Sequence, residues 1–479
     1  MTDGGHVHPT RDDAVVTALS EGVGGPMGAR SRGNWLTPAS AVLLLTGLCF
    51  ALGMVQKSSC YDATWGNGQS RYSHMCYSDL PYLYTGRGMV EHTWPYTDDE
   101  QVRDRYEVME YPVGISYWAW GAGWATHVLT GLPDLSERYD QDPGALWGDD
   151  DVQREIRVFV VVNAIGFAAL ALAAAWLLTK VNPRRPWDAA VFALSPALAL
   201  TGIINWDLLA VALVAAALWA WATGRPVLTG VMIGLGAATK LYPLFLLGGL
   251  LVICLRDKRL RDFRVATGAA VAAWVLANAP AYLTGRDEWT VFWEFNSDRG
   301  ADLGSIWLVI SQAANTTIEA ATINGWSWAL FGLWCLGVLV LGLRAPETPR
   351  LAQLGFLVVV GFLLVNKVYS PQYVLWLLPL AALARPRWRD QLIWQSGEVL
   401  YFAAVWWYLG GYLAPAGGDD AGFYWVAIVA RMLAELYLVA MVVRDIWWPE
   451  LDPVREAGWA DSPVHRGNVR FSGEVSPQT

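Results

Sequence analysis

The sequence has little charge for its length. Asp, Glu, Lys and Arg make up 16% of its 479 residues, whereas soluble domains carry about 25% charged residues. The mean hydropathy is +0.29, and long uncharged runs accompany the deficit. These features exclude an ordinary soluble domain and indicate a polytopic membrane protein. The net charge of −9 gives no sign of nucleic-acid binding, and we expect no nucleic-acid partner.

The sequence also lacks the motifs of nucleotide-dependent and metal-dependent soluble enzymes. No Gly-rich nucleotide loop opens a helix, no Walker pattern is present, and the six His residues are scattered. We therefore expect no cofactor and no metal site, and the use of a divalent ion is left open. A donor in the form of a cytosolic nucleotide sugar is disfavoured for the same reason.

Cysteine is scarce as well, with five residues in the chain. Cys49, Cys254 and Cys335 fall inside apolar runs, whereas Cys60 and Cys76 share the first loop. If that loop lies outside the cytoplasm, a disulfide between Cys60 and Cys76 is favoured. Two unrelated thiols are the alternative.

The two ends of the chain are polar. Residues 1–33 are expected to form a disordered cytoplasmic tail rather than a signal peptide, since no apolar core begins before Trp35. Residues 450–479 are expected to form a second disordered cytoplasmic tail. Residues 34–449 then make up the membrane domain, in which 56–155 is a long, acidic extracytoplasmic loop.

Hydrophobic runs and basic flanks predict the topology. The runs that read as spans are 35–55, 156–178, 189–204, 208–223, 265–282, 326–343, 399–413 and 423–443. Residues 111–129 are placed in the membrane interface, because a crossing there would put Lys180, Arg184 and Arg185 outside, against the positive-inside rule. Residues 284–305 are expected to be an outer loop and 306–321 an interfacial segment.

Two further apolar runs have basic residues on both flanks. Residues 227–255 and 354–384 must each return to the side on which they began, so each is predicted to be a hairpin of two short helices. The first breaks at Lys240-Leu241-Tyr242-Pro243 and the second at the tip 366–373. Broken helices are tolerated where they line a cavity. The predicted fold class is an all-α polytopic membrane protein with about 12 transmembrane helices, interfacial helices in the first loop and both termini cytoplasmic.

The strongest catalytic candidate lies in the first loop. Asp79 belongs to a Cys-Tyr-Ser-Asp-Leu-Pro stretch at 76–81, where aromatic and apolar residues surround it. A carboxylate in such surroundings has a pKa suited to a general base. A solvated loop acid is the plain alternative, and Asp207 in the turn 205–207 is the reserve candidate.

Several polar residues are predicted to face the same side as Asp79. They are Asn205, Asp207, Lys240, Arg299, Lys367 and Gln372. Ionisable groups at membrane depth usually face a cavity. One acid with three cations suits an anionic substrate that presents a hydroxyl to be deprotonated, such as a lipid-phosphate sugar with its acceptor. The alternatives are a snorkelling Lys240, an interfacial Lys367 and an Arg299 that pairs with Asp298 or Asp302. Arg431 and Glu435, four apart in the last span, are expected to be a structural pair.

Five motifs together resemble the GT-C glycosyltransferases, specifically the polyprenol-phosphate-mannose-dependent family 87 of actinobacteria. They are Asp79 within 77–80, Glu110-Tyr111-Pro112, Asn205-Trp206-Asp207, Lys240-Leu241-Tyr242-Pro243, and Lys367 through Gln372, which together cover about 35–443. The resemblance implies a GT-C fold, an extracytoplasmic site and a catalytic Asp79. It implies Glu110, Tyr111 and Tyr242 as further substrate-binding residues.

The resemblance also implies the partners of the protein. They are membrane lipids, a polyprenyl-phosphate-linked sugar as donor and a glycolipid or glycan acceptor of the mannolipid, lipoglycan or cell-wall type. The long acidic first loop and its two cysteines depart from the family pattern and leave the acceptor open. The rival classes are a transporter or a lipid or glycan flippase, and a structural membrane partner. A transporter would place charge near the bilayer midplane in both halves.

Overall fold

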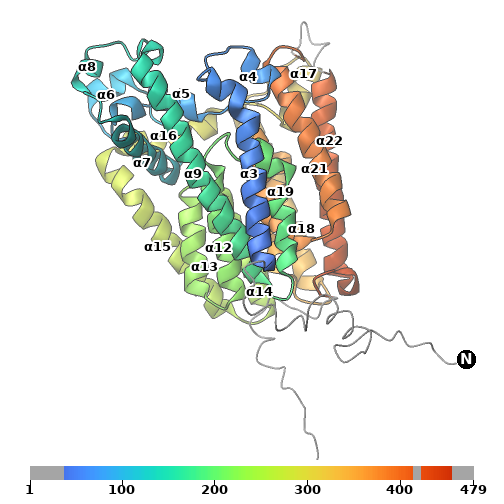
Figure 1. The fold of residues 1–479 in the computed structure, drawn as a ribbon. Coiled ribbons are helices and arrows are strands. Elements are labelled where there is room, and N and C mark those ends of the chain that lie inside the picture. Colours follow the sequence, from blue (N-terminus) through green and yellow to red (C-terminus); the bar gives the residue numbers. More distant parts are fainter. Residues whose placement is uncertain (1–36, 414–421, 456–479) are drawn as a thin grey trace, which may run out of the picture.

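The computed structural model describes residues 37–413 and 422–455, and in these ranges the chain forms helices and no strand (Figure 1). The predicted tail 1–33 lies outside the described residues, as does the part 456–479 of the predicted tail 450–479. Five helices are long and apolar enough to cross a membrane. They are α3 (Pro38–Asp62), α9 (Asp150–Val181), α15 (Leu260–Thr284), α18 (Ala320–Arg344) and α22 (Gly422–Trp447). Their length and composition indicate a helical membrane protein.

Shorter helices fill the bundle between these five. They are α12 (Asp207–Ala222), α13 (Pro226–Ala237), α14 (Leu246–Arg256), α19 (Leu351–Val365), α20 (Val374–Ala384) and the longer α21 (Trp388–Leu409). Both predicted hairpins break where expected: η4 (Tyr242–Phe245) separates α13 from α14, and η5 (Pro371–Tyr373) precedes α20. The total of twelve crossings stays a prediction.

Close packing of α13 against α15 depends on small residues. A Cβ added at Gly230 would lie 2.0 Å from the Ala266 carbonyl oxygen, and one at Gly234 would lie 2.2 Å from that of Ala270. Residues four apart lie on one helix face, so the two glycines let the backbones of α13 and α15 meet directly, as small residues do in membrane helix pairs.

The span predicted at 189–204 is wrong as a single helix. The chain forms η3 (Pro186–Ala189), α10 (Ala190–Ala193) and α11 (Pro196–Thr201) instead. Pro196 lacks a backbone N–H and disfavours helical geometry at the residue before it. Ser195 accordingly adopts an extended conformation, and its side chain accepts a hydrogen bond from the Ala197 amide to cap α11.

One end of the bundle, here called the loop end, carries most of the short elements (Figure 1). They are α4 (Ser70–Ser73), α5 (Leu80–Gly86), η1 (Met89–Glu91), α6 (Glu100–Arg105), α7 (Val113–Thr130), α8 (Ser136–Tyr139), η2 (Leu146–Gly148), α16 (Arg286–Asp298) and α17 (Ile306–Ala313). Helix α7 is the segment assigned to the interface, and it lies among these elements. The region 284–305, expected to be a loop, is mostly the helix α16. Helix α3 continues to Asp62 rather than ending near residue 55.

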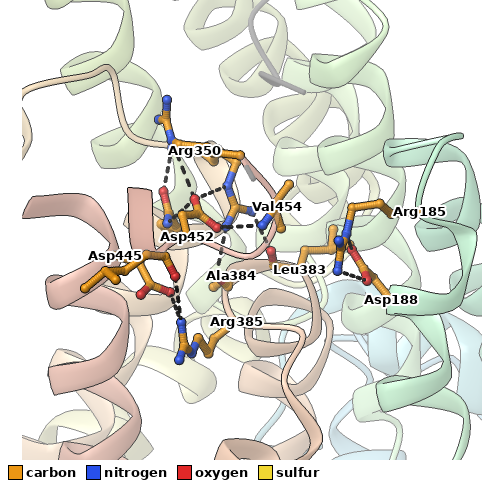
Figure 2. Close-up of polar contacts among 12 residues, drawn as sticks. Arg185, Asp188, Arg350, Leu383, Ala384, Arg385, Asp445, Asp452 and Val454 are labelled. Carbon is orange, nitrogen blue, oxygen red and sulfur yellow. Dashed lines mark hydrogen bonds and ion pairs between the residues drawn. The ribbon is translucent and has the colours of Figure 1, made fainter. Parts of the chain in front are cut away.

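The opposite end of the bundle is held by buried ion pairs (Figure 2). Arg350 donates to both carboxylate oxygens of Asp452, at 3.0 and 3.1 Å, and to the carbonyls of Leu383 and Ala384. Arg385 pairs with Asp445 at 2.5 Å. The expectation of a disordered tail is therefore wrong for its first residues: η6 (Pro449–Leu451) and Asp452 are fixed to the bundle, because Asp452 supplies the counter-charge that a buried arginine needs.

Candidate active site

A cavity of about 590 Å³ is formed where the first loop, α16, α18 and the two hairpin tips meet. Eight of the ten predicted catalytic and substrate-binding residues line it: Asp79, Glu110, Tyr111, Asn205, Lys240, Arg299, Lys367 and Gln372. Asp207 and Tyr242 do not line it and lie behind its wall. Residues that are far apart in the sequence thus share one cavity.

The acid end of the cavity is built around Asp79. The Asp79 amide donates to the Ile204 carbonyl at 2.9 Å, and the Ser78 hydroxyl donates to the Ile203 carbonyl at 2.8 Å. These bonds attach the first loop to the turn before α12. Asp79 precedes α5, yet its side chain makes no capping hydrogen bond there, so the carboxylate is left for the cavity.

Two neighbours orient the Asp79 carboxylate. Asn205 Nδ2 donates to Asp79 Oδ2 at 2.7 Å and lies 2.8 Å from the Tyr111 hydroxyl, which is itself 3.5 Å from Asp79 Oδ2. Burial raises the pKa of Asp79 to about 6, against the opposing effects of hydrogen bonds from Asn205 and Tyr77 and of the Lys240 charge. A carboxylate with a pKa near neutral is suited to accept a proton.

Lys240 lines the cavity but is paired with a buried acid. Its Nζ is 3.5 Å from Asp207 Oδ1 and 4.9 Å from the centroid of the Tyr111 ring. Asp207 is fully buried (0% exposed) and also accepts from Trp376 Nε1 at 2.6 Å. The reserve base therefore sits behind the wall as the counter-ion of Lys240. Tyr242 stacks on Trp376 with ring centroids 4.6 Å apart, which supports the same wall.

Two cations that lie near each other, Arg299 and Lys367, also line the cavity. Lys367 Nζ contacts Asn324 Oδ1 at 2.6 Å and the Ser297 carbonyl at 3.3 Å, and it makes no ion pair with the described residues. Arg299 pairs with Asp302 at 2.5 Å, as one alternative expected, and keeps about a quarter of its side chain exposed. Burial and the nearby Arg299 lower the pKa of Lys367. Such a pair attracts an anion, which would relieve the repulsion between the two cations.

The remaining side of the cavity is an apolar end formed by aromatic rings. It consists of Phe292, Trp293 and Phe295 on α16, Trp328 and Phe331 on α18, and Phe362 on α19. Phe331 and Phe362 have ring centroids 5.5 Å apart. This surface is suited to a hydrocarbon chain and not to a hydrated group.

The wall that carries the cations is itself fixed by a buried charge. The Asp302 amide donates to the Lys367 carbonyl at 2.9 Å. This bond joins the segment after α16 to the second hairpin tip. Arg431 donates to the Gly304 carbonyl at 3.0 Å and to Glu435 at 3.0 Å. The pair Arg431–Glu435 is therefore more than an ion pair within one helix, because it positions the loop behind Arg299 and Lys367.

Asn324 and Trp376 are among the contributors to this cavity that sequence reasoning missed. Asn324 holds Lys367, and a polar residue at the start of an apolar helix was the available signal. Trp376 binds Asp207, and no feature of α20 distinguished this Trp from an ordinary interfacial one. Cys60 and Cys76 form a disulfide with Cα atoms 5.7 Å apart, which closes the loop that carries α4.

The fold and the cavity together define a helical membrane protein. Its cavity contains an acid, two cations and an apolar surface. The model of glycosyltransferase family 87 matches residues 154–366, from α9 to the second hairpin tip. The match supports the family to which the motifs pointed and indicates a glycosyltransferase. It includes Asn205, Lys240 and Arg299, whereas Asp79 lies before it and Lys367 directly after it. No curated protein matched the chain.

Proposed function

We propose that the protein is a GT-C membrane glycosyltransferase. It transfers a sugar, with mannose as the proposed sugar, from a polyprenyl-phosphate donor to a glycolipid or glycan acceptor. The observation that carries this proposal is that three kinds of group line one cavity. The aromatic surface provides for a hydrocarbon chain, Arg299 and Lys367 for a phosphate, and Asp79 for a reacting hydroxyl.

The proposed reaction uses each of these groups. The acceptor hydroxyl oxygen forms a bond to the anomeric carbon, while the bond from that carbon to the phosphate oxygen breaks. Asp79 takes the hydroxyl proton, and the polyprenyl phosphate leaves with the negative charge that Arg299 and Lys367 stabilise. Lys240, paired with Asp207, acts at the acid end, where its charge favours the ionised form of Asp79. This revises its expected role as a phosphate ligand.

The proposed location is the cell membrane, with the loop end facing the extracytoplasmic side. The basic flanks of α14 and α9, including Lys180 and Arg256, lie at the ends of these helices away from the first loop and would then face the cytoplasm. Both termini would be cytoplasmic. The disulfide Cys60–Cys76 would lie on the oxidising side.

The direct test uses the purified full chain in lipid nanodiscs with radiolabelled polyprenyl-phosphate mannose and a membrane lipid extract as acceptor source. Transfer of label to an acceptor supports the proposal, and a matched nucleotide sugar should give none. Transfer from the nucleotide sugar alone would refute the donor class. Lipid-donor binding without any transfer, together with movement of the donor across the bilayer, would favour the flippase alternative.

Lys367→Ala is expected to raise the KM for the donor by about 10- to 100-fold, because a hydrogen bond to a charged group contributes about 1.5–3 kcal/mol. Lys367→Arg should restore activity only in part, since a planar fork replaces a point charge. Lys180→Ala, which removes an exposed lysine of α9, is the matched control and should leave the KM unchanged. A donor KM equal to wild type in Lys367→Ala would contradict the phosphate role.

The rate should depend on pH through Asp79. The active form of the base is the carboxylate, and the pKa of Asp79 is raised to about 6. We expect kcat/KM to be constant well above pH 6 and to fall about tenfold per pH unit below it. The donor is a phosphodiester that keeps its single charge over this range. A profile without an inflection between pH 5 and 7 would count against Asp79 as the base.

A further inference from the structure

Six residues that line the same cavity carry no charge: Tyr72, Tyr77, Ser370, Gln372, Trp406 and Leu409. This part of the lining is called the aromatic arm. Arg71 stacks on the Tyr72 ring, with its guanidinium carbon 4.9 Å from the ring centroid, and donates to the Tyr82 hydroxyl, but it is not among the residues that line the cavity. The uncharged lining favours a neutral ligand.

The rings of the aromatic arm come from separate parts of the chain. Trp406 on α21 has its centroid 5.3 Å from that of Tyr77 and 6.4 Å from that of Tyr72. The disulfide-closed loop 60–76 carries Tyr72 on α4, and α4 lies against α21. A Cβ at Gly410 would lie 3.1 Å from that of Tyr72, so a glycine at this position permits the approach.

Two buried polar atoms in the aromatic arm have no hydrogen-bond partner in the described part of the chain. They are Nε1 of Trp406, a residue that is 3% exposed, and Oε1 of Gln372, a residue that is 6% exposed. Gln372 lies in η5, which packs against α21. A buried polar group without a partner is costly. One of these atoms donates and the other accepts, and a hydroxyl group can satisfy either.

The aromatic arm also adjoins the reacting group. The Tyr77 hydroxyl lies near the Asp79 carboxylate and lowers the pKa of Asp79. A molecule seated against Tyr77 and Trp406 would therefore lie close to the base.

We propose that the aromatic arm is the acceptor subsite and binds a neutral pyranoside ring, with Trp406 Nε1 and Gln372 Oε1 hydrogen-bonded to its hydroxyls. This rests on the proposed function, and it adds that the acceptor residue next to the reacting hydroxyl is an uncharged sugar. Aromatic walls with a few fixed polar groups are the usual composition of small-molecule sites. A site built to bond a hydroxyl rejects analogues that lack it.

The test is saturation-transfer NMR on the full chain in nanodiscs, with methyl mannopyranoside and methyl glucopyranoside as probes and cyclohexanol as the analogue without the ring hydroxyls. At least one sugar should receive saturation on its ring protons, and cyclohexanol should receive much less. Trp406→Phe, which removes the N–H, should weaken sugar binding about tenfold, as expected for one lost hydrogen bond. Tyr72→Leu, at a partly exposed position, should also weaken it.

Trp388→Phe is the matched control, because Trp388 is 46% exposed at the opposite end of the same helix. It should leave sugar binding unchanged. Absence of sugar binding to wild type, or unchanged binding in both Trp406→Phe and Tyr72→Leu, would overturn the subsite.

Donor transfer measured on the same samples separates the two proposals. Sugar binding that is lost in Trp406→Phe, without any transfer by wild type, would support the subsite and refute the proposed function. Transfer by wild type with an acceptor KM unchanged in Trp406→Phe would support the proposed function and refute the subsite.

Discussion

Asp79→Asn is expected to lower turnover by about 10²–10⁴-fold, the usual cost of losing a general base, while donor binding stays close to wild type. The amide keeps the shape of the side chain and can still accept the hydrogen bond that Asn205 donates at 2.7 Å. It cannot take a proton from an acceptor hydroxyl. The loss should therefore fall on kcat and leave the donor Kd unchanged.

The comparison that decides this assignment is Asp207→Asn at matched expression. Asp207 is fully buried and bound to Trp376 and Lys240, so its loss should act indirectly, through the position of Lys240, and less severely. The pH dependence gives a second measure, since the inflection near pH 6 should disappear in Asp79→Asn. Near-normal turnover in Asp79→Asn beside an inactive Asp207→Asn would move the base to the second turn.

The first hairpin shows what sequence could predict here. Basic residues on both flanks of 227–255 and a single Pro243 define a return and a break, and both rest on physical rules that hold irrespective of partners. The same reasoning placed Lys240 and Lys367 at hairpin tips. Both hairpin tips lie on the same side of the bundle and contribute to one cavity. This is why most of the predicted site residues line that cavity.

The roles within the cavity depended on partners that sequence does not reveal. Asp207 read as an exposed turn residue, yet Trp376, far along the chain, covers it. This contact and the ion pair with Lys240 are the reason for proposing Asp207 as a counter-ion rather than as the base. Asp452 read as part of a polar tail, although it neutralises Arg350, which lies about a hundred residues earlier. In both cases the residue was correctly interpreted as polar, but its partner lies far away in the sequence, and that partner determines where the side chain is buried.

Arg431→Leu is expected to lower the free energy of unfolding by about 3–5 kcal/mol, the usual effect of removing one member of a buried ion pair. Arg431 is 1% exposed, and Glu435 is fully buried. Without the guanidinium, Glu435 loses its 3.0 Å partner and must stay charged without compensation or take up a proton. The Gly304 carbonyl loses its donor at the same time.

A second carboxylate makes this position more sensitive. Glu398 is buried nearby and accepts from the hydroxyl of Tyr369 at 3.0 Å and from Trp394 Nε1 at 2.9 Å. The Arg431 guanidinium lies 3.6 Å from the centroid of the Tyr369 ring. Removing Arg431 therefore leaves two buried acids around one tyrosine, and this tyrosine belongs to the hairpin tip that carries Lys367.

Unfolding in detergent, followed by tryptophan fluorescence against denaturant, measures the effect. Arg431→Lys keeps the charge and should lose less stability than Arg431→Leu. The double variant Arg431→Leu with Glu435→Leu removes both charges and should recover much of the loss, because an apolar pair of similar volume often replaces a buried ion pair without cost. Equal stability of the single and double variants would show that the unpaired carboxylate is not the cause. The loss would then be assigned to the freed Gly304 carbonyl and to the loop that holds Arg299 and Lys367.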